Sequence, residues 1–120
     1  MSYDRFIKSL TEGDPNAQMH PALKALWYDK SGDWETAHQV VQDQTDPCSA
    51  LIHGYLHRKE GDEWNARYWY NRAGRKPFKG SLDAEWLKLA RELTSERNSV
   101  DLIDRNSKSS SNDLDRSLRA

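Results

Sequence analysis

Two of the four histidines in the chain, His53 and His57, stand four positions apart. On a helix this spacing brings both imidazole rings to one face, as some zinc sites require. His38 and Glu60 are further candidate ligands, but no spacing fixes a third ligand and no His-Glu-x-x-His arrangement is present. The histidines therefore leave one alternative function open, a small metal-binding or acid–base protein centred on His38, His53 and His57.

Packing is the interpretation that the sequence favours for these histidines. In a helical hairpin, His53, Gly54 and His57 would fall on the helix face that meets the following helix. Side chains of that size would pack there against Ala66 and Tyr70. On this interpretation the chain holds no metal, and no cofactor is expected.

A second group of residues suits binding rather than reaction. Trp64 and Tyr68 lie one helical turn apart. The basic residues around them are Arg67, Arg72, Arg75 and Lys76. Tyrosine, tryptophan and arginine are the types most enriched in binding hot spots, so this surface would suit an acidic peptide or a C-terminal carboxylate. The alternative is that both rings pack beneath the last helix or the N-terminal segment.

Capping residues divide the chain into short helices that would position these groups. Helices are predicted over about residues 2–10, 21–31, 34–43, 47–60, 63–74 and 81–94. Pro21 and Pro47 suit a first helical turn, where a missing N–H costs nothing. Leu82, Trp86 and Leu89 lie on one stripe of the last helix, so that helix should dock on the body.

One turn motif occurs twice. Gly32-Asp33 is followed by Ala37, and Gly61-Asp62 is followed by Ala66, 29 positions later in each case. The glycine can take the left-handed conformation that ends a helix, and the aspartate accepts hydrogen bonds from the free N–H groups of the next one. The small alanine lets the two helices approach closely.

This plan resembles the tetratricopeptide (TPR) and Sel1-like repeat families, in which Gly-Asp at the turn is followed by Ala, an aromatic residue and Ala. The second repeat matches through Gly54, Gly61, Asp62, Ala66, Tyr70, Ala73 and Pro77. The first departs at Val41 and Gln44, and the period of 29 is shorter than the usual ~34. The resemblance covers about residues 21–78. Residues 55–62 and 66–75 also look like a group of uncharacterised bacterial proteins, which brings no activity with it.

The resemblance implies an all-α fold of two stacked antiparallel helical hairpins. We expect an N-terminal segment with a short helix over 1–20, a repeat domain over 21–94 and a disordered polar tail over 95–120. Two repeats are fewer than the three that a stable solenoid normally needs. The terminal helices should therefore cap the stack, or a second copy of the chain should do so.

Composition limits the classes of partner. The formal net charge of -1 does not suggest a nucleic-acid binder. No apolar run approaches the ~20 residues that would cross a membrane, and no signal peptide is visible. The single cysteine suits a reducing cytoplasm. With no catalytic constellation evident, the sequence favours an interaction or scaffold module for an unidentified protein or peptide.

Overall fold

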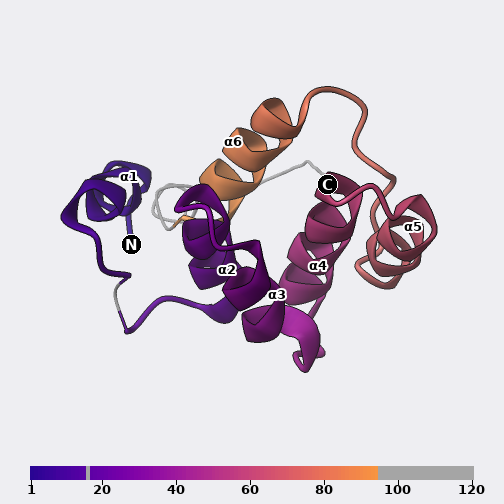
Figure 1. Cartoon of the computed structure of the whole chain (residues 1–120), viewed down its shortest axis with the longest axis horizontal. Coiled ribbons are helices and arrows are strands. Elements are labelled where there is room, and N and C mark those ends of the chain that lie inside the picture. The colour runs from indigo at the N-terminus through magenta and orange to yellow at the C-terminus, as the bar shows by residue number, and fades with distance from the viewer. Residues whose placement is uncertain (16, 95–120) are drawn as a thin grey trace, which may run out of the picture.

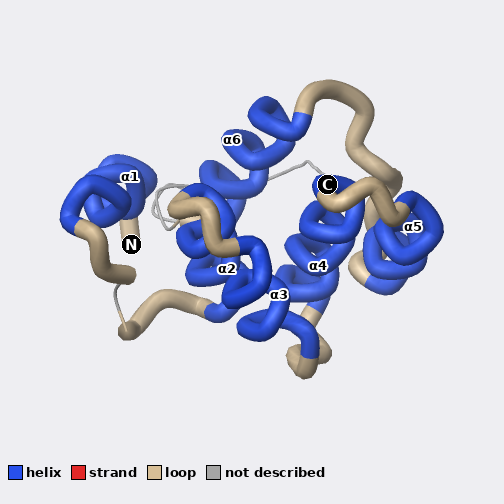
Figure 2. The backbone as a smooth tube through the Cα atoms, in the orientation of Figure 1, coloured by secondary structure: helices blue, strands red, loops and turns tan. Residues whose placement is uncertain are grey.

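The computed structural model describes residues 1–15 and 17–94, which form six α-helices and no strand (Figures 1 and 2). The helices are α1 (Tyr3–Glu12), α2 (Pro21–Lys30), α3 (Trp34–Gln42), α4 (Pro47–Lys59), α5 (Glu63–Arg72) and α6 (Leu82–Leu93). The all-α class is therefore confirmed, and each helix lies within about two residues of its expected bounds. The tail expected over 95–120 lies outside the described residues.

The two Gly-Asp turns have the same geometry. Gly32 and Gly61 both have a φ of 90°, in the left-handed region that favours glycine. In each turn the N–H of the aspartate donates to the carbonyl five residues earlier, at 2.9 Å. The side chains of Asp33 and Asp62 then cap α3 and α5. The two Gly-Asp motifs thus form turns of the same local geometry.

Helices that are neighbours in the chain have the most extensive contacts, α4 with α5 and α2 with α3. α3 also packs against α4 and so joins the two pairs. α6 returns to lie against both α2 and α4, while α1 and α5 lie at opposite ends of the molecule (Figure 1). The α3–α4 contact is the one that brings the histidines together.

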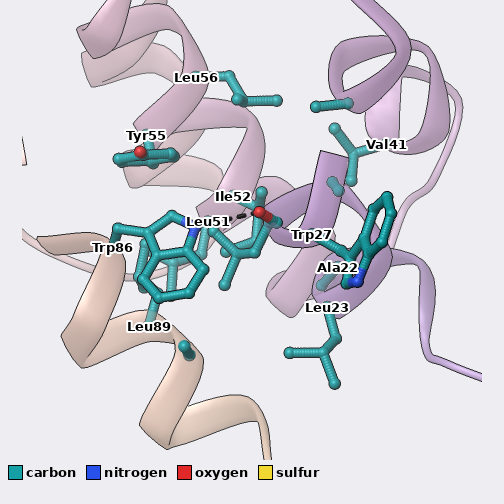
Figure 3. Packing of buried hydrophobic residues seen from close by; sticks show 14 of the residues in the cluster. Ala22, Leu23, Trp27, Val41, Leu51, Ile52, Tyr55, Leu56, Trp86 and Leu89 are labelled. Carbon is teal, nitrogen blue, oxygen red and sulfur yellow. Dashed lines mark hydrogen bonds between the residues drawn. The ribbon is translucent and has the colours of Figure 1, made fainter. Parts of the chain in front are cut away.

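Large aromatic residues join the terminal helices to the centre. Trp86 of α6 donates its indole N–H to the carbonyl of Leu26, at 3.0 Å (Figure 3). Its ring also stacks on Phe6 of α1, with the ring centroids 5.9 Å apart. Trp27 of α2 donates to the hydroxyl of Ser9 in α1, at 3.0 Å. The hydrophobic core therefore extends from α1 through α2 to α6.

Two buried carboxylates add polar links that the sequence did not reveal. Asp29 of α2 and Glu85 of α6 are 3% and 1% exposed, and each accepts two hydrogen bonds from neighbouring helices. The donors are Tyr55 and Lys59 to Asp29, and Tyr70 and Arg58 to Glu85, all at 2.5–2.7 Å. Burial, together with the acceptor carboxylate, raises the pKa of both tyrosines, so each remains a hydrogen-bond donor.

Candidate functional site

Three histidines converge where α3 meets α4. His38 comes from α3, and His53 and His57 come from successive turns of α4. The Nε2 atoms of His38 and His53 lie 3.0 Å apart. One ring nitrogen from each histidine lies within 4.8 Å of the other two. The spacing of four did place His53 and His57 together, and the α3–α4 contact supplies the third ring.

Tryptophan rings hold two of these imidazoles in place. Trp34 stacks on His38, with ring centroids 5.0 Å apart and an interplanar angle of 7°. Trp69 of α5 stacks on His53 at 3.9 Å and 14°. The indole N–H of Trp34 donates to the carbonyl of Leu56 at 2.9 Å, which fixes that ring to α4. The His53 and His38 rings therefore have little freedom to turn.

A carboxylate orients the third imidazole. Nδ1 of His57 lies 2.6 Å from Oε2 of Glu60, one turn further along the chain. An ionised carboxylate can only accept, so Nδ1 carries the proton in this contact. A neutral His57 then has its unprotonated lone pair on Nε2. Asp62 also lies close to His57 and Glu60.

Burial keeps two of the rings neutral. Burial, together with smaller contributions from the neighbouring His38 and His57, lowers the pKa of His53 to about 4. Burial also lowers the pKa of His38, with a smaller contribution from His57 that Glu60 and Glu35 partly oppose. At neutral pH both imidazoles are therefore uncharged and able to offer a lone pair.

The hydrogen bonding of His53 is incomplete. Its side chain is 4% exposed, and Nδ1 has no hydrogen-bond partner. Nearby, Gly54 takes the closest approach to α5, because a Cβ there would stand 3.2 Å from backbone atoms of Ala66 and Tyr70. Gly54 is thus the residue of α4 that faces Ala66 and Tyr70. His53 lies against Trp69 instead.

The second candidate site is the aromatic–arginine face, which consists of Trp64, Arg67, Tyr68, Arg72 and Arg75. Trp64 is 69% exposed and Tyr68 is 44% exposed. Their rings are nearly parallel, with centroids 6.2 Å apart. The alternative in which both rings pack beneath a terminal segment is therefore wrong for the described residues. The two rings instead form an apolar surface on α5.

The basic residues of this face differ in whether they already pair with a carboxylate. Arg75 pairs with Glu92 of α6, and Arg67 lies 3.8 Å from the exposed Glu63. Arg72 lies over the ring of Tyr68 at 5.8 Å. Among the described residues, neither Arg72 nor Lys76 forms an ion pair. An open hollow of about 540 Å³ is lined by Trp64, Arg67, Tyr68, Asn71, Arg75, Lys76 and Pro77.

No helix in residues 1–15 and 17–94 combines the length and apolar character needed to span a membrane. Comparison with protein-family models, with curated proteins and with solved structures gave no match. The resemblance to TPR and Sel1-like repeats therefore stays a prediction.

Proposed function

We propose that the chain is an interaction module that binds an acidic peptide on the aromatic–arginine face. The exposure of the stacked Trp64 and Tyr68 rings carries this proposal. They are two of the three large hydrophobic side chains exposed in the described residues, the third being Leu87 of α6. Burying such rings against a partner would release water from both faces, and each ring covers a large area at little cost in side-chain entropy.

The positive charge around the rings favours a negatively charged partner. Arg72 and Lys76 have no carboxylate partner in the described residues, so each can pair with an acidic group without breaking an ion pair. The pair of Arg67 with Glu63 is long and exposed, so it contributes little and is easily exchanged. An Asp or Glu beside an apolar residue in the peptide would match the rings and the cations together.

The helix arrangement supports a role as a scaffold. We propose that α2–α3 and α4–α5 are two TPR/Sel1-like hairpins capped by α1 and α6. The identical Gly-Asp turns and the close approach at Gly54 both favour this assignment. Such repeats bury a continuous core and present a fixed outer surface, which suits recognition of an extended peptide.

A random peptide library displayed on phage, selected on the immobilised full chain, tests the proposal. We expect the recovered peptides to be enriched in Asp and Glu, and their binding to weaken as salt screens the charges. Trp64→Ala should weaken binding of a recovered peptide by about 30-fold, the loss expected for a hot-spot residue worth ~2 kcal/mol. Arg72→Glu should also weaken it by adding repulsion.

Leu87→Ala is the matched control, because it removes the other exposed large side chain and lies on α6. It should leave peptide binding unchanged, and thermal melts should show that all three variants remain folded. Selected peptides without acidic enrichment would count against the proposal. So would peptides that bind Trp64→Ala as tightly as the parent protein.

A further inference from the structure

We propose that His38, His53 and His57 form a binding site for a divalent transition-metal ion, with zinc as the best fit. This site lies at the α3–α4 junction, and it is independent of peptide binding on α5. It is carried by the convergence of three imidazoles from two helices. The contacts around the rings give four separate reasons to assign a ligand there.

The first reason is distance. Zinc binds imidazole nitrogen at about 2.0–2.1 Å, and a tetrahedral arrangement then sets neighbouring nitrogens about 3.3 Å apart. The Nε2 atoms of His38 and His53 are already 3.0 Å apart, and the third nitrogen lies within 4.8 Å of both. For all three nitrogens to reach ligand distance, the His57 nitrogen would have to move closer to the other two.

The second reason is that the ligand rings are held in advance. Trp34 stacks on His38 and Trp69 stacks on His53, so each ring is packed against a tryptophan before any ion arrives. A metal ion would therefore order few side chains on binding, and little of the binding free energy would be lost to entropy.

The third reason is the carboxylate behind His57. Imidazoles that bind metals usually donate their other ring N–H to a carboxylate or carbonyl, which fixes the tautomer and raises the basicity of the ligand nitrogen. Glu60 is that carboxylate for His57, because its Oε2 lies 2.6 Å from Nδ1 of the imidazole. The lone pair of Nε2 is then available to the ion.

The fourth reason is that packing explains the arrangement poorly. Facing Nε2 atoms of two neutral imidazoles can share only one proton, and Nδ1 of His53 is buried without a partner. An unsatisfied buried polar atom costs about 1–3 kcal/mol, a penalty that an apolar ring would avoid. With an ion present, each facing Nε2 would instead give its lone pair to the metal, while Nδ1 of His53 would carry the proton and keep its own cost of burial.

The donor set also indicates the kind of metal. Imidazole nitrogens suit zinc, copper and nickel, whereas magnesium and calcium prefer oxygen ligands. His38 is half-buried and Glu60 is exposed, so the ion would keep one side toward solvent. A water molecule can occupy the fourth position there.

Isothermal titration calorimetry with zinc chloride tests the proposal on the full chain, without an affinity tag and after treatment with a chelator. We expect one zinc ion per chain. His38→Phe keeps a ring on Trp34 but removes the ligand nitrogen, so it should abolish the heat of binding. Glu60→Gln should weaken zinc binding about 10–100-fold, the usual effect of losing the residue that accepts a hydrogen bond from a metal ligand. Cobalt(II) should give the visible absorption of a tetrahedral site in the parent protein only.

The matched control is His20→Asn, which removes the one histidine outside the cluster and keeps a side chain able to cap α2. It should bind zinc as the parent does. Circular dichroism melts establish that each variant is folded, and His53→Phe provides a second ligand deletion that retains a ring on Trp69. The proposal is overturned if the parent gives no heat, or if folded His38→Phe and His53→Phe both bind zinc like the parent. Loss of binding in His20→Asn would also overturn it.

Discussion

Single buried side chains in this protein connect helices through polar contacts. Glu85 is the clearest case, because one buried carboxylate accepts from Tyr70 of α5 and from Arg58 of α4. An ion pair of this kind is not by itself strongly stabilising, since both charges lose their water. Removing one partner is costly, however, because the other partner is left without a counter-charge.

Glu85→Ala should therefore lower the free energy of unfolding by about 3–5 kcal/mol. The loss leaves the Tyr70 hydroxyl without its acceptor and the Arg58 guanidinium without its counter-charge, although Arg58 still donates to the Gly80 carbonyl. Urea denaturation followed by circular dichroism measures it. Glu63→Ala is the matched control, because its carboxylate is exposed and lies 3.8 Å from Arg67, so its effect should stay within about 0.5 kcal/mol. Equal stabilities for the two variants would contradict the role given to Glu85.

For single residues, the sequence predicted where some side chains lie and not where others lie. It placed Trp64 and Tyr68 on a separate side of α5 from Tyr70, because helical periodicity is a local property. It did not identify Glu85 as buried, since an acidic residue in the first turn of a helix is ordinarily exposed. Nor could spacing show His38 beside His53, because that contact depends on how α3 packs against α4.

At the scale of elements, the helix boundaries follow from residues close by in the chain. Each helix begins where a side chain accepts the free N–H groups, and Ser2, Asp46 and Ser81 do this for α1, α4 and α6. These signals are local, so the sequence was enough to predict all six helices. The pairing of α4 with α5 also needs a small residue at Gly54, where the two backbones come close.

Gly54→Val should destabilise the protein by about 1–3 kcal/mol through overpacking of α4 against α5. Its Cβ would stand 3.2 Å from the Ala66 carbonyl oxygen and the Tyr70 nitrogen, which are backbone atoms and cannot rotate away. Thermal and urea denaturation measure the change.

Gln39→Val is the matched control, because it places the same β-branched side chain on an exposed helical position of α3. Its cost should be limited to the helix propensity of valine, within about 0.7 kcal/mol. If Gly54→Val were no more harmful than Gln39→Val, α4 and α5 would not need the close approach.

For the whole molecule, the terminal helices complete a core that two helix pairs leave open. The single side chain of Trp86 contacts two other helices, α2 through Leu26 and α1 through Phe6. The sequence predicted that α6 docks on the body, from its apolar stripe. Which helices it covers could not be predicted, because the docking position is set by Trp86 and by the buried Glu85 together.

Trp86→Ala should cost about 3–5 kcal/mol, as for other large buried aromatic residues. That is a large share of the stability of a domain this size, so the variant should melt at a clearly lower temperature. Loosening of α6 would also expose apolar parts of α2 and α4, and size-exclusion chromatography with light scattering should then detect association. A variant as stable and monodisperse as the parent would show that α6 is not part of the folded core.

The buried carboxylate of Glu85 also implies an order of events during folding. Both donors to Glu85 belong to the α4–α5 pair, so α6 finds no partner for its carboxylate until that pair exists. Docking earlier would bury a lone negative charge, which is strongly unfavourable. The contacts within α4–α5 are also close in sequence and quick to form. The α4–α5 pair should therefore assemble first, and α6 should pack against it as a late step.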